Sequence, residues 1–209
     1  MRGLARLAVY ASCAKDYYTI VGALRRRGLP FLSLTPDRRL PRWVRVVVVP
    51  SRDAGKLSLP PEVKLIEVEG DDVELIPIKA KLALQGKELF AELLVGIDPG
   101  ETCGLAVLGD LDLVDYGVYR DVGRLKRYLD LLLGASLSRR TLIRVGGGSP
   151  KHRDRVLSAL PSLRGVEVEV VDESQAVEVL PMLIEGVPRD VASAVRIALK
   201  RGSRLRLNE

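Results

Sequence analysis

The sequence predicts an α/β protein of two units, and three observations support this. Short apolar segments of strand length alternate with longer segments of helical periodicity along the chain. Positive charge is uneven, because residues 1–88 hold 16 Lys and Arg against 10 Asp and Glu, whereas the remainder holds 17 of each sign. A composition of 47% hydrophobic and 29% charged residues excludes a disordered chain. We therefore expect a small basic α/β domain over residues 1–88 and a second domain over residues 89–209.

The first unit is expected to hold one helix among short buried strands. The helix covers residues 16–27, where apolar side chains recur on one face and Gly28 ends the pattern. The strands are expected at residues 7–10, 31–34, 44–49 and 63–68. The turn at residues 12–15 lacks the glycine spacing of known phosphate loops, so Ser12 is predicted to cap the helix rather than to bind phosphate. The polar segment 79–88 then separates the two units.

The second unit has a more informative order of elements. Three strands come first and are followed by alternating helices and strands. The strands are expected at 93–97, 104–108, 113–119, 141–145 and 166–171, and the helices at 121–137, 150–160 and 188–200. Short connections join the first three strands, which predicts antiparallel pairing, and helical crossovers make the last two strands parallel to the first. The prediction is a five-stranded mixed sheet with flanking helices.

Cysteine usage and hydropathy bear on the compartment. Cys13 and Cys103 have no spacing that could build a zinc site. The apolar stretch at residues 7–11 is shorter than the roughly 7 to 15 residues of a signal-peptide core, and no run approaches the roughly 18 residues of a membrane span. We expect a cytoplasmic protein without a membrane partner. Scarce Asn and Gln favour a thermophilic source.

Three carboxylates in the second unit are candidates for chemistry. Asp98 ends an apolar strand, Glu173 follows the fifth strand, and Asp190 begins the last helix on its apolar side. Each has an ordinary structural explanation: a turn aspartate for Asp98, and stabilisation of a helix N-terminus for the other two. Asp172 and Gln175 have capping-box spacing, which strengthens that explanation for Glu173. Together, however, the three acids can reach one point beside the sheet.

The segments that carry these acids resemble a known family. They are Gly96-Ile97-Asp98-Pro99-Gly100, Gly104-Leu105-Ala106, Val171-Asp172-Glu173 and Asp190-Val191-Ala192-Ser193-Ala194. In this order they are similar to the RuvC/YqgF branch of the ribonuclease H-like superfamily, over residues 90–202. The resemblance implies a ribonuclease H-like fold and an Mg²⁺- or Mn²⁺-dependent endonuclease that hydrolyses structured DNA or RNA. It implies that Asp98 bridges the metal ions, that Glu173 binds one or orients the attacking water, and that Asp190 is a further ligand.

Two departures from the family pattern bear on activity. RuvC proteins carry a second aspartate in the last helix where this chain has Ser193, so the YqgF pattern with a single aspartate fits better. The fourth strand ends in Val145-Gly146-Gly147-Gly148 without an acid, which leaves three candidate ligands.

The glycine-rich turn after the fourth strand is a candidate nucleic-acid contact. Gly147, Gly148 and Ser149 precede a predicted helix, and Lys151 and Arg153 follow in its first turn. Bare backbone N–H groups and a helix N-terminus suit a phosphate. A glycine turn before a solvated basic helix is the equal alternative.

Three functions are therefore compared. The first is a metal-dependent nuclease of the Holliday-junction-resolvase or RNA-processing type, with a basic N-terminal domain that helps to hold nucleic acid. The second is a catalytically inactive nucleic-acid-binding protein on the same fold, which the two departures favour. The third, phosphotransfer as in actin-like ATPases, needs a second domain with phosphate loops, which residues 1–88 do not supply. The sequence does not say whether the nucleic acid is DNA or RNA, which structure is cut, or whether the chain forms a homodimer.

Overall fold

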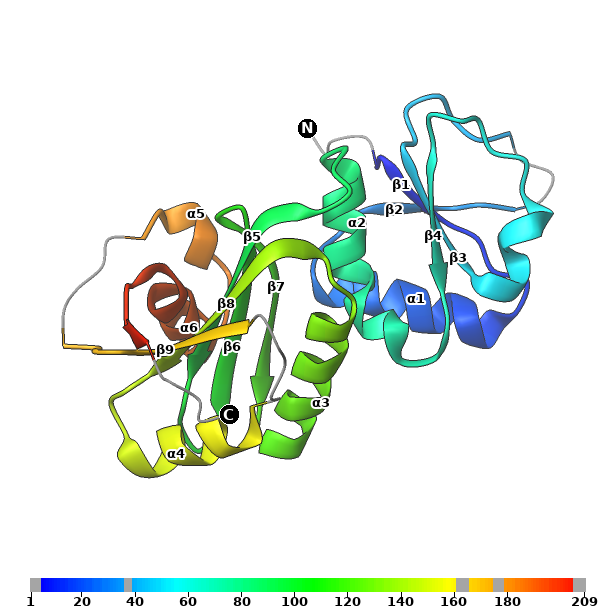
Figure 1. Cartoon of the computed structure of the whole chain (residues 1–209). Coiled ribbons are helices and arrows are strands. Elements are labelled where there is room, and N and C mark those ends of the chain that lie inside the picture. The colour runs from blue at the N-terminus through cyan, green and yellow to red at the C-terminus, as the bar shows by residue number, and fades with distance from the viewer. Residues whose placement is uncertain (1–4, 36–38, 161–165, 175–178, 205–209) are drawn as a thin grey trace. The chain divides into compact units, whose positions relative to one another are not determined.

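The computed structural model describes residues 5–35, 39–160, 166–174 and 179–204. The chain divides into two compact units, Met1–Glu88 and Leu89–Glu209. Figure 1 shows a parallel sheet in the first unit and a mixed sheet in the second. Within the described residues, no helix is both long enough and apolar enough to cross a lipid bilayer.

The first unit is a four-stranded parallel sheet in the order β2-β1-β3-β4. Its strands are β1 (Leu7–Val9), β2 (Phe31–Ser33), β3 (Val46–Pro50) and β4 (Lys64–Val68). Its helices are α1 (Ala14–Arg26) and α2 (Ile76–Leu84), with 3-10 turns η1 (Ser51–Lys56) and η2 (Gly70–Leu75). Buried residues of α1 and α2 pack on one face of this sheet, whereas loop side chains cover the other face.

Helix α2 was not expected, because the sequence predicts a polar separator over residues 79–88. Its Ile76, Ile78, Ala80 and Leu82 are all buried. These apolar residues recur every second position, which is not the spacing of an amphipathic helix. Burial on several sides of the helix therefore explains why periodicity did not reveal it.

Ser12 does not cap α1, contrary to the prediction. The N-cap residue is Cys13, and Ser12 instead donates its backbone N–H and its hydroxyl to the two oxygens of Asp53, each at 2.7 Å. The Lys56 ammonium lies 2.7 Å from the same carboxylate, which is completely buried. Burial by itself would raise the pKa of Asp53, but the bonds from Lys56 and Ser12 outweigh it and lower the pKa to about 2. This turn is therefore closed by an ionic network around the buried Asp53 carboxylate.

The second unit is a six-stranded sheet in the order β10-β9-β8-β5-β6-β7. The strands are β5 (Phe90–Asp98), β6 (Cys103–Gly109), β7 (Asp112–Tyr119), β8 (Ser138–Gly146), β9 (Val166–Val171) and β10 (Ser203–Arg204). Strands β5, β8 and β9 are parallel, and the β5–β6 and β6–β7 pairs are antiparallel. This confirms the predicted mixed sheet and ribonuclease H-like order, with Asp98 on a central strand. The two-residue β10, antiparallel to β9, was not predicted.

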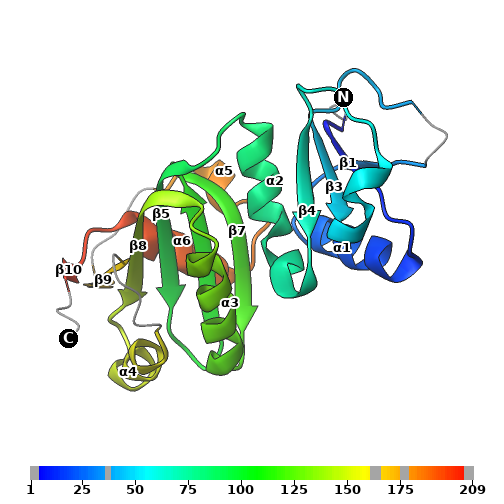
Figure 2. The same ribbon diagram turned by 45° about the vertical axis from the view of Figure 1, so that its right-hand side comes forward.

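The helices of this unit lie on both faces of its sheet (Figure 2). They are α3 (Val122–Gly134), α4 (Pro150–Ala159), α5 (Pro181–Ile184) and α6 (Arg189–Leu199). Helix α6 packs through Ala194, Val195 and Ala198 on the face that holds Leu94 and Leu142. The sequence predicts Pro188 as the first residue of this helix. In the structure Pro188 is instead the N-cap of α6, which begins at Arg189.

Two glycines let the backbone of α6 approach the sheet closely. A Cβ atom on Gly96 would lie 2.0 Å from the carbonyl oxygen of Ala194, and one on Gly104 would lie 2.1 Å from that of Asp190. The guanidinium of Arg144 donates to the carbonyl oxygen of Ala198 at 2.6 Å, near the other end of the helix. These contacts fix α6 over the middle of the sheet.

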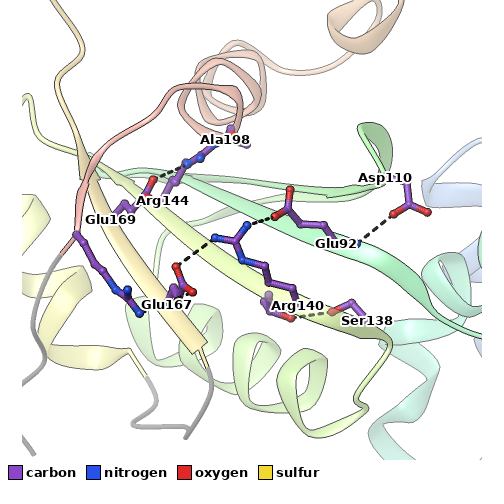
Figure 3. Close-up of polar contacts among 10 residues, drawn as sticks. Glu92, Asp110, Ser138, Arg140, Arg144, Glu167, Glu169 and Ala198 are labelled. Carbon is purple, nitrogen blue, oxygen red and sulfur yellow. Dashed lines mark hydrogen bonds and ion pairs between the residues drawn. The ribbon is translucent and has the colours of Figure 1, made fainter.

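Charged side chains on β5, β8 and β9 form ion pairs across the strands (Figure 3). Arg140 lies between Glu92 and Glu167, with N···O distances of 2.7 and 3.2 Å. Arg144 donates to Glu169 at 2.8 Å as well as to α6. Burial would raise the pKa of Glu169, but hydrogen bonds from Arg144 and the Gly202 N–H outweigh it, so the pKa is lowered.

Substitution of Gly104 by alanine should destabilise the second unit by about 1–3 kcal/mol, because the new methyl group must displace the backbone of α6. Scanning calorimetry of the whole chain measures this loss. Gly134→Ala is the matched control, since a Cβ at the end of α3 meets nothing within 4 Å. Equal transition temperatures for the two variants would contradict the close approach.

Asp53→Asn should destabilise the first unit by about 1–3 kcal/mol near neutral pH, because buried hydrogen bonds are lost. The pKa of Asp53 falls from 3.8 to about 2 on folding, so the stabilisation is complete above the unfolded value and is lost as the pH falls through the folded one. Urea denaturation followed by fluorescence of Trp43, the single tryptophan, reports on this unit. The difference between wild type and variant should shrink at acid pH, and exposed Asp71→Asn should show none at any pH.

Candidate functional site

Asp98 lies on the sheet face that α6 covers. Side chains alternate between the two faces of a strand, and Gly96, two residues earlier, faces α6. Asp98 is the last residue of β5 and pairs with Gly104 of the antiparallel neighbour β6. It is half-buried there, at the end of an otherwise buried strand.

Asp190 reaches the same place through the close packing of α6. Its backbone lies directly over Gly104, and its own Cβ is 3.1 Å from the position that a Cβ of Gly104 would take. The Thr102 hydroxyl donates to the Asp190 carboxylate at 2.6 Å. Because Gly104 is the cross-strand partner of Asp98, the glycine brings the two acids together.

Glu173 lies two residues beyond the end of β9 and reaches the site from the β8 side of β5, opposite to β6. A Cβ on Gly146 would lie 2.4 Å from its Oε1 atom, and the Gly148 N–H donates to that same oxygen at 2.9 Å. Residue pairing continues from Ile97 and Val145 along parallel β5 and β8, so Gly146 lies beside Asp98. The glycines after β8 therefore form a cradle for the Glu173 carboxylate.

The pKa of Asp98 responds to the other two acids. Its pKa is raised chiefly by burial, then by the negative charges of Glu173 and Asp190, while a hydrogen bond with the Ser193 side chain opposes the shift. Ser193 lies one turn after Asp190 on α6, so both side chains are on the same side of the helix. The residue that departs from the RuvC pattern therefore lowers the pKa of the central acid.

A divalent cation suits the chemistry of this site, but the acids are not placed to hold one. In the described part of the chain, no three His, Cys, Asp or Glu residues are positioned to bind a common metal ion. Carboxylate oxygens are ligands that Mg²⁺ and Mn²⁺ prefer, but the Asp190 backbone and the Glu173 carboxylate already fill the space beside Gly104 and Gly146. The carboxylates of Asp190 and Glu173 instead accept hydrogen bonds from Thr102 and Gly148.

The backbone amides of the glycine-rich turn form hydrogen bonds within the protein, which the sequence does not predict. The Gly147 N–H donates to the Val171 carbonyl at 2.9 Å, and the Gly148 N–H is held by Glu173. Ser149 is the N-cap of α4, but its hydroxyl lies 3.2 Å from His152 Nδ1 and does not bond to the helix backbone. Two of the amides predicted to meet a phosphate thus have partners within the chain.

Helix α4 carries basic side chains, one of which reaches the loop after Asp98. Lys151 is exposed, and Arg153 donates to the neighbouring Asp154 at 2.8 Å. Arg155, which belongs to the same basic run of the sequence, donates to the Gly100 carbonyl at 3.1 Å and so connects α4 to the loop after Asp98. Its spacing of four residues from Lys151 places the two on the same helix face.

A depression of about 490 Å³ opens beside the glycine cradle, and its lining includes Gly147, Gly148, Asp172, Glu173 and Ser174. Asp172 accepts hydrogen bonds from the N–H and the hydroxyl of Ser174, both at 2.9 Å, and so shapes its rim. The predicted capping partner of Asp172, Gln175, lies outside the described residues.

Comparisons with known proteins give two partial matches. Residues 6–79 match the family model of a response regulator receiver-like domain, which is less than half of the chain. Among solved structures, the chain is similar to T. thermophilus RuvC in complex with a Holliday junction substrate, at 20% identity and a TM-score of 0.36, over 51% of this chain and 90% of that one. No curated protein matches the chain. The fold assignment of the second unit therefore rests on its strand order and directions.

Asp98→Asn should stabilise the metal-free protein, raising the midpoint of the second unit's thermal transition by about 1–3 °C, because it relieves repulsion from Glu173 and Asp190. Calorimetry in the presence of a chelator measures the shift. Glu101→Gln, an exposed acid in the adjacent turn, is the control and should leave the midpoint unchanged. A lower midpoint for Asp98→Asn would mean that the acids do not repel one another.

Proposed function

We propose that the chain binds structured nucleic acid and hydrolyses its phosphodiester bonds with a divalent metal ion. The observation that carries this proposal is the placement of Asp190 over Gly104 and of Glu173 against Gly146, beside Asp98, whose pKa both of these acids raise. Grouped acids in a half-buried position cost stability, and such perturbed groups are frequent at functional sites. A bound cation would remove that cost.

In this proposal Asp98, Glu173 and Asp190 would hold Mg²⁺ or Mn²⁺, and their carboxylates would have to move closer together to do so. A bound ion would supply an activated water and would stabilise charge on the attacking and leaving oxygens. Thr102, Ser193 and the Gly148 N–H hold the carboxylates until the ion is bound. Lys151 and Arg153 of α4 contact the phosphate backbone beside the acids, and Arg155 supports the loop that follows Asp98.

Nucleic-acid binding without cleavage is the second candidate, and a specific observation favours it. Ser193 stands where RuvC proteins carry an acid, and its hydrogen bond stabilises the Asp98 carboxylate without any ion. The described acids are also not placed to share a metal ion. A protein that kept the fold and lost its chemistry would have these features.

The test of cleavage uses the full chain, a four-way DNA junction, duplex DNA and structured RNA, with Mg²⁺, with Mn²⁺ and with a chelator. The nuclease proposal expects metal-dependent cleavage that Asp98→Asn reduces by about 100-fold or more, equivalent to about 2.7 kcal/mol of transition-state stabilisation. Glu101→Gln should cleave like the wild type. Metal-independent cleavage, or an Asp98→Asn variant as fast as the wild type, would contradict the assignment of the acids.

Binding is measured separately, by fluorescence anisotropy at increasing salt. Because the net charge of +6 arises within residues 1–88 and α4 is basic, affinity should fall steeply as salt increases. Asp98→Asn should bind at least as tightly as the wild type. Binding without cleavage under every metal condition would favour the second candidate, and absence of binding at low salt would contradict both.

A further inference from the structure

The first unit contains a cavity that the proposed function does not use. It encloses about 280 Å³ between α1 and the ends of β3 and β4. Pro50 and Val68, the last residues of these two strands, both line it. In open α/β sheets, ligands bind beyond the carboxyl ends of the parallel strands, at the point where the strand order reverses, which here lies between β1 and β3. The cavity lies at the same carboxyl edge of the sheet, one strand further along, between β3 and β4.

The interior and the rim of the cavity differ in chemistry. Apolar side chains of Ile20, Val68 and Val73 line its interior. Asp16, Arg52 and Glu69 are the charged residues of the lining. The cavity thus offers an apolar surface together with one cationic and two anionic groups.

The charged groups are accessible to a ligand. Arg52 donates a hydrogen bond to Asp16, and their side chains are 57% and 28% exposed. Ion pairs with this exposure contribute little to stability, so a ligand can replace either partner at low cost. Glu69 is exposed, at the start of η2. The guanidinium and the two carboxylates can therefore bind opposite ends of one small molecule.

We propose that this cavity binds a free α-amino acid with an aliphatic side chain. The ligand carboxylate pairs with Arg52, its ammonium group pairs with Asp16 and Glu69, and its side chain packs on Ile20, Val68 and Val73. A purely anionic ligand would meet two carboxylates, and a purely cationic ligand would leave Arg52 without its partner. A zwitterion with an apolar body satisfies both signs of charge. The volume, near the lower end of the roughly 300–1,000 Å³ of small-molecule pockets, suits a ligand of this size.

The first experiment uses three probes with the same carbon skeleton, titrated into the full chain by calorimetry. L-leucine carries both charged groups, isoamylamine lacks the carboxylate, and 4-methylpentanoate lacks the ammonium group. L-leucine should bind, and each of the other two should bind at least about tenfold more weakly, because one charge-assisted contact is missing. Equal binding of all three probes, or no binding of L-leucine at millimolar concentration, would overturn the proposal.

The second experiment changes the protein. Arg52→Met should weaken L-leucine binding by about tenfold or more, and Glu69→Gln should weaken it less, because Asp16 still faces the ammonium group. Arg39→Met removes another exposed arginine of the same unit, which does not line the cavity, and should bind like the wild type. The fluorescence of Trp43 checks that each variant is folded. Unchanged affinity of folded Arg52→Met would place any leucine site elsewhere.

Discussion

The closeness of α6 to the central sheet is the constraint on which the candidate site depends. Gly96 and Gly104 have no side chains to hold the helix away, so its backbone lies almost directly on β5 and β6. That contact sets the position of Asp190 beside Asp98 and brings Ser193 within reach of the same carboxylate. Arg144 holds the far end of the helix through a carbonyl oxygen. The two glycines thus determine how closely α6 approaches the sheet, and this distance determines where Asp190 lies relative to Asp98.

Two aspartates show how differently this chain treats a buried negative charge. Asp53 is completely buried, yet an ammonium group and two donors from Ser12 satisfy it, so burial is outweighed and its pKa falls. Asp98 is only half-buried, but its neighbours are two further acids and its pKa is raised. The protein itself supplies all the hydrogen-bond and ionic partners described for Asp53, so this aspartate has a structural role. The second leaves negative charge without a compensating cation, which is the condition that a ligand can relieve.

Much of the fold was predictable because apolar strands and short or helical connections restrict the topology of a sheet. The mixed sheet with Asp98 at its centre follows from this reasoning. The missing parts depend on tertiary contacts: α2 is buried on several sides, and the partner of Ser12 lies 41 residues away in Asp53. Of the candidate site, the identities of the three acids came from motif spacing. The glycine cradle around Glu173 and the hydroxyl contacts from Thr102 and Ser193 did not, because they require three-dimensional proximity.

The short strand β10 has a consequence for the behaviour of this protein in concentrated solution. It pairs with Glu169 and Val170 of β9, and the Gly202 N–H before it is bonded to the carboxylate of Glu169. An uncovered edge strand offers free N–H and carbonyl groups to any other extended chain, which is how sheets join into aggregates. The two residues of β10 cover part of the edge of β9, and β9 itself carries the charged side chains of Glu167 and Glu169. Both features hinder pairing with another chain at this edge of the sheet. This short pairing therefore reduces the length of β9 backbone that another extended chain could reach.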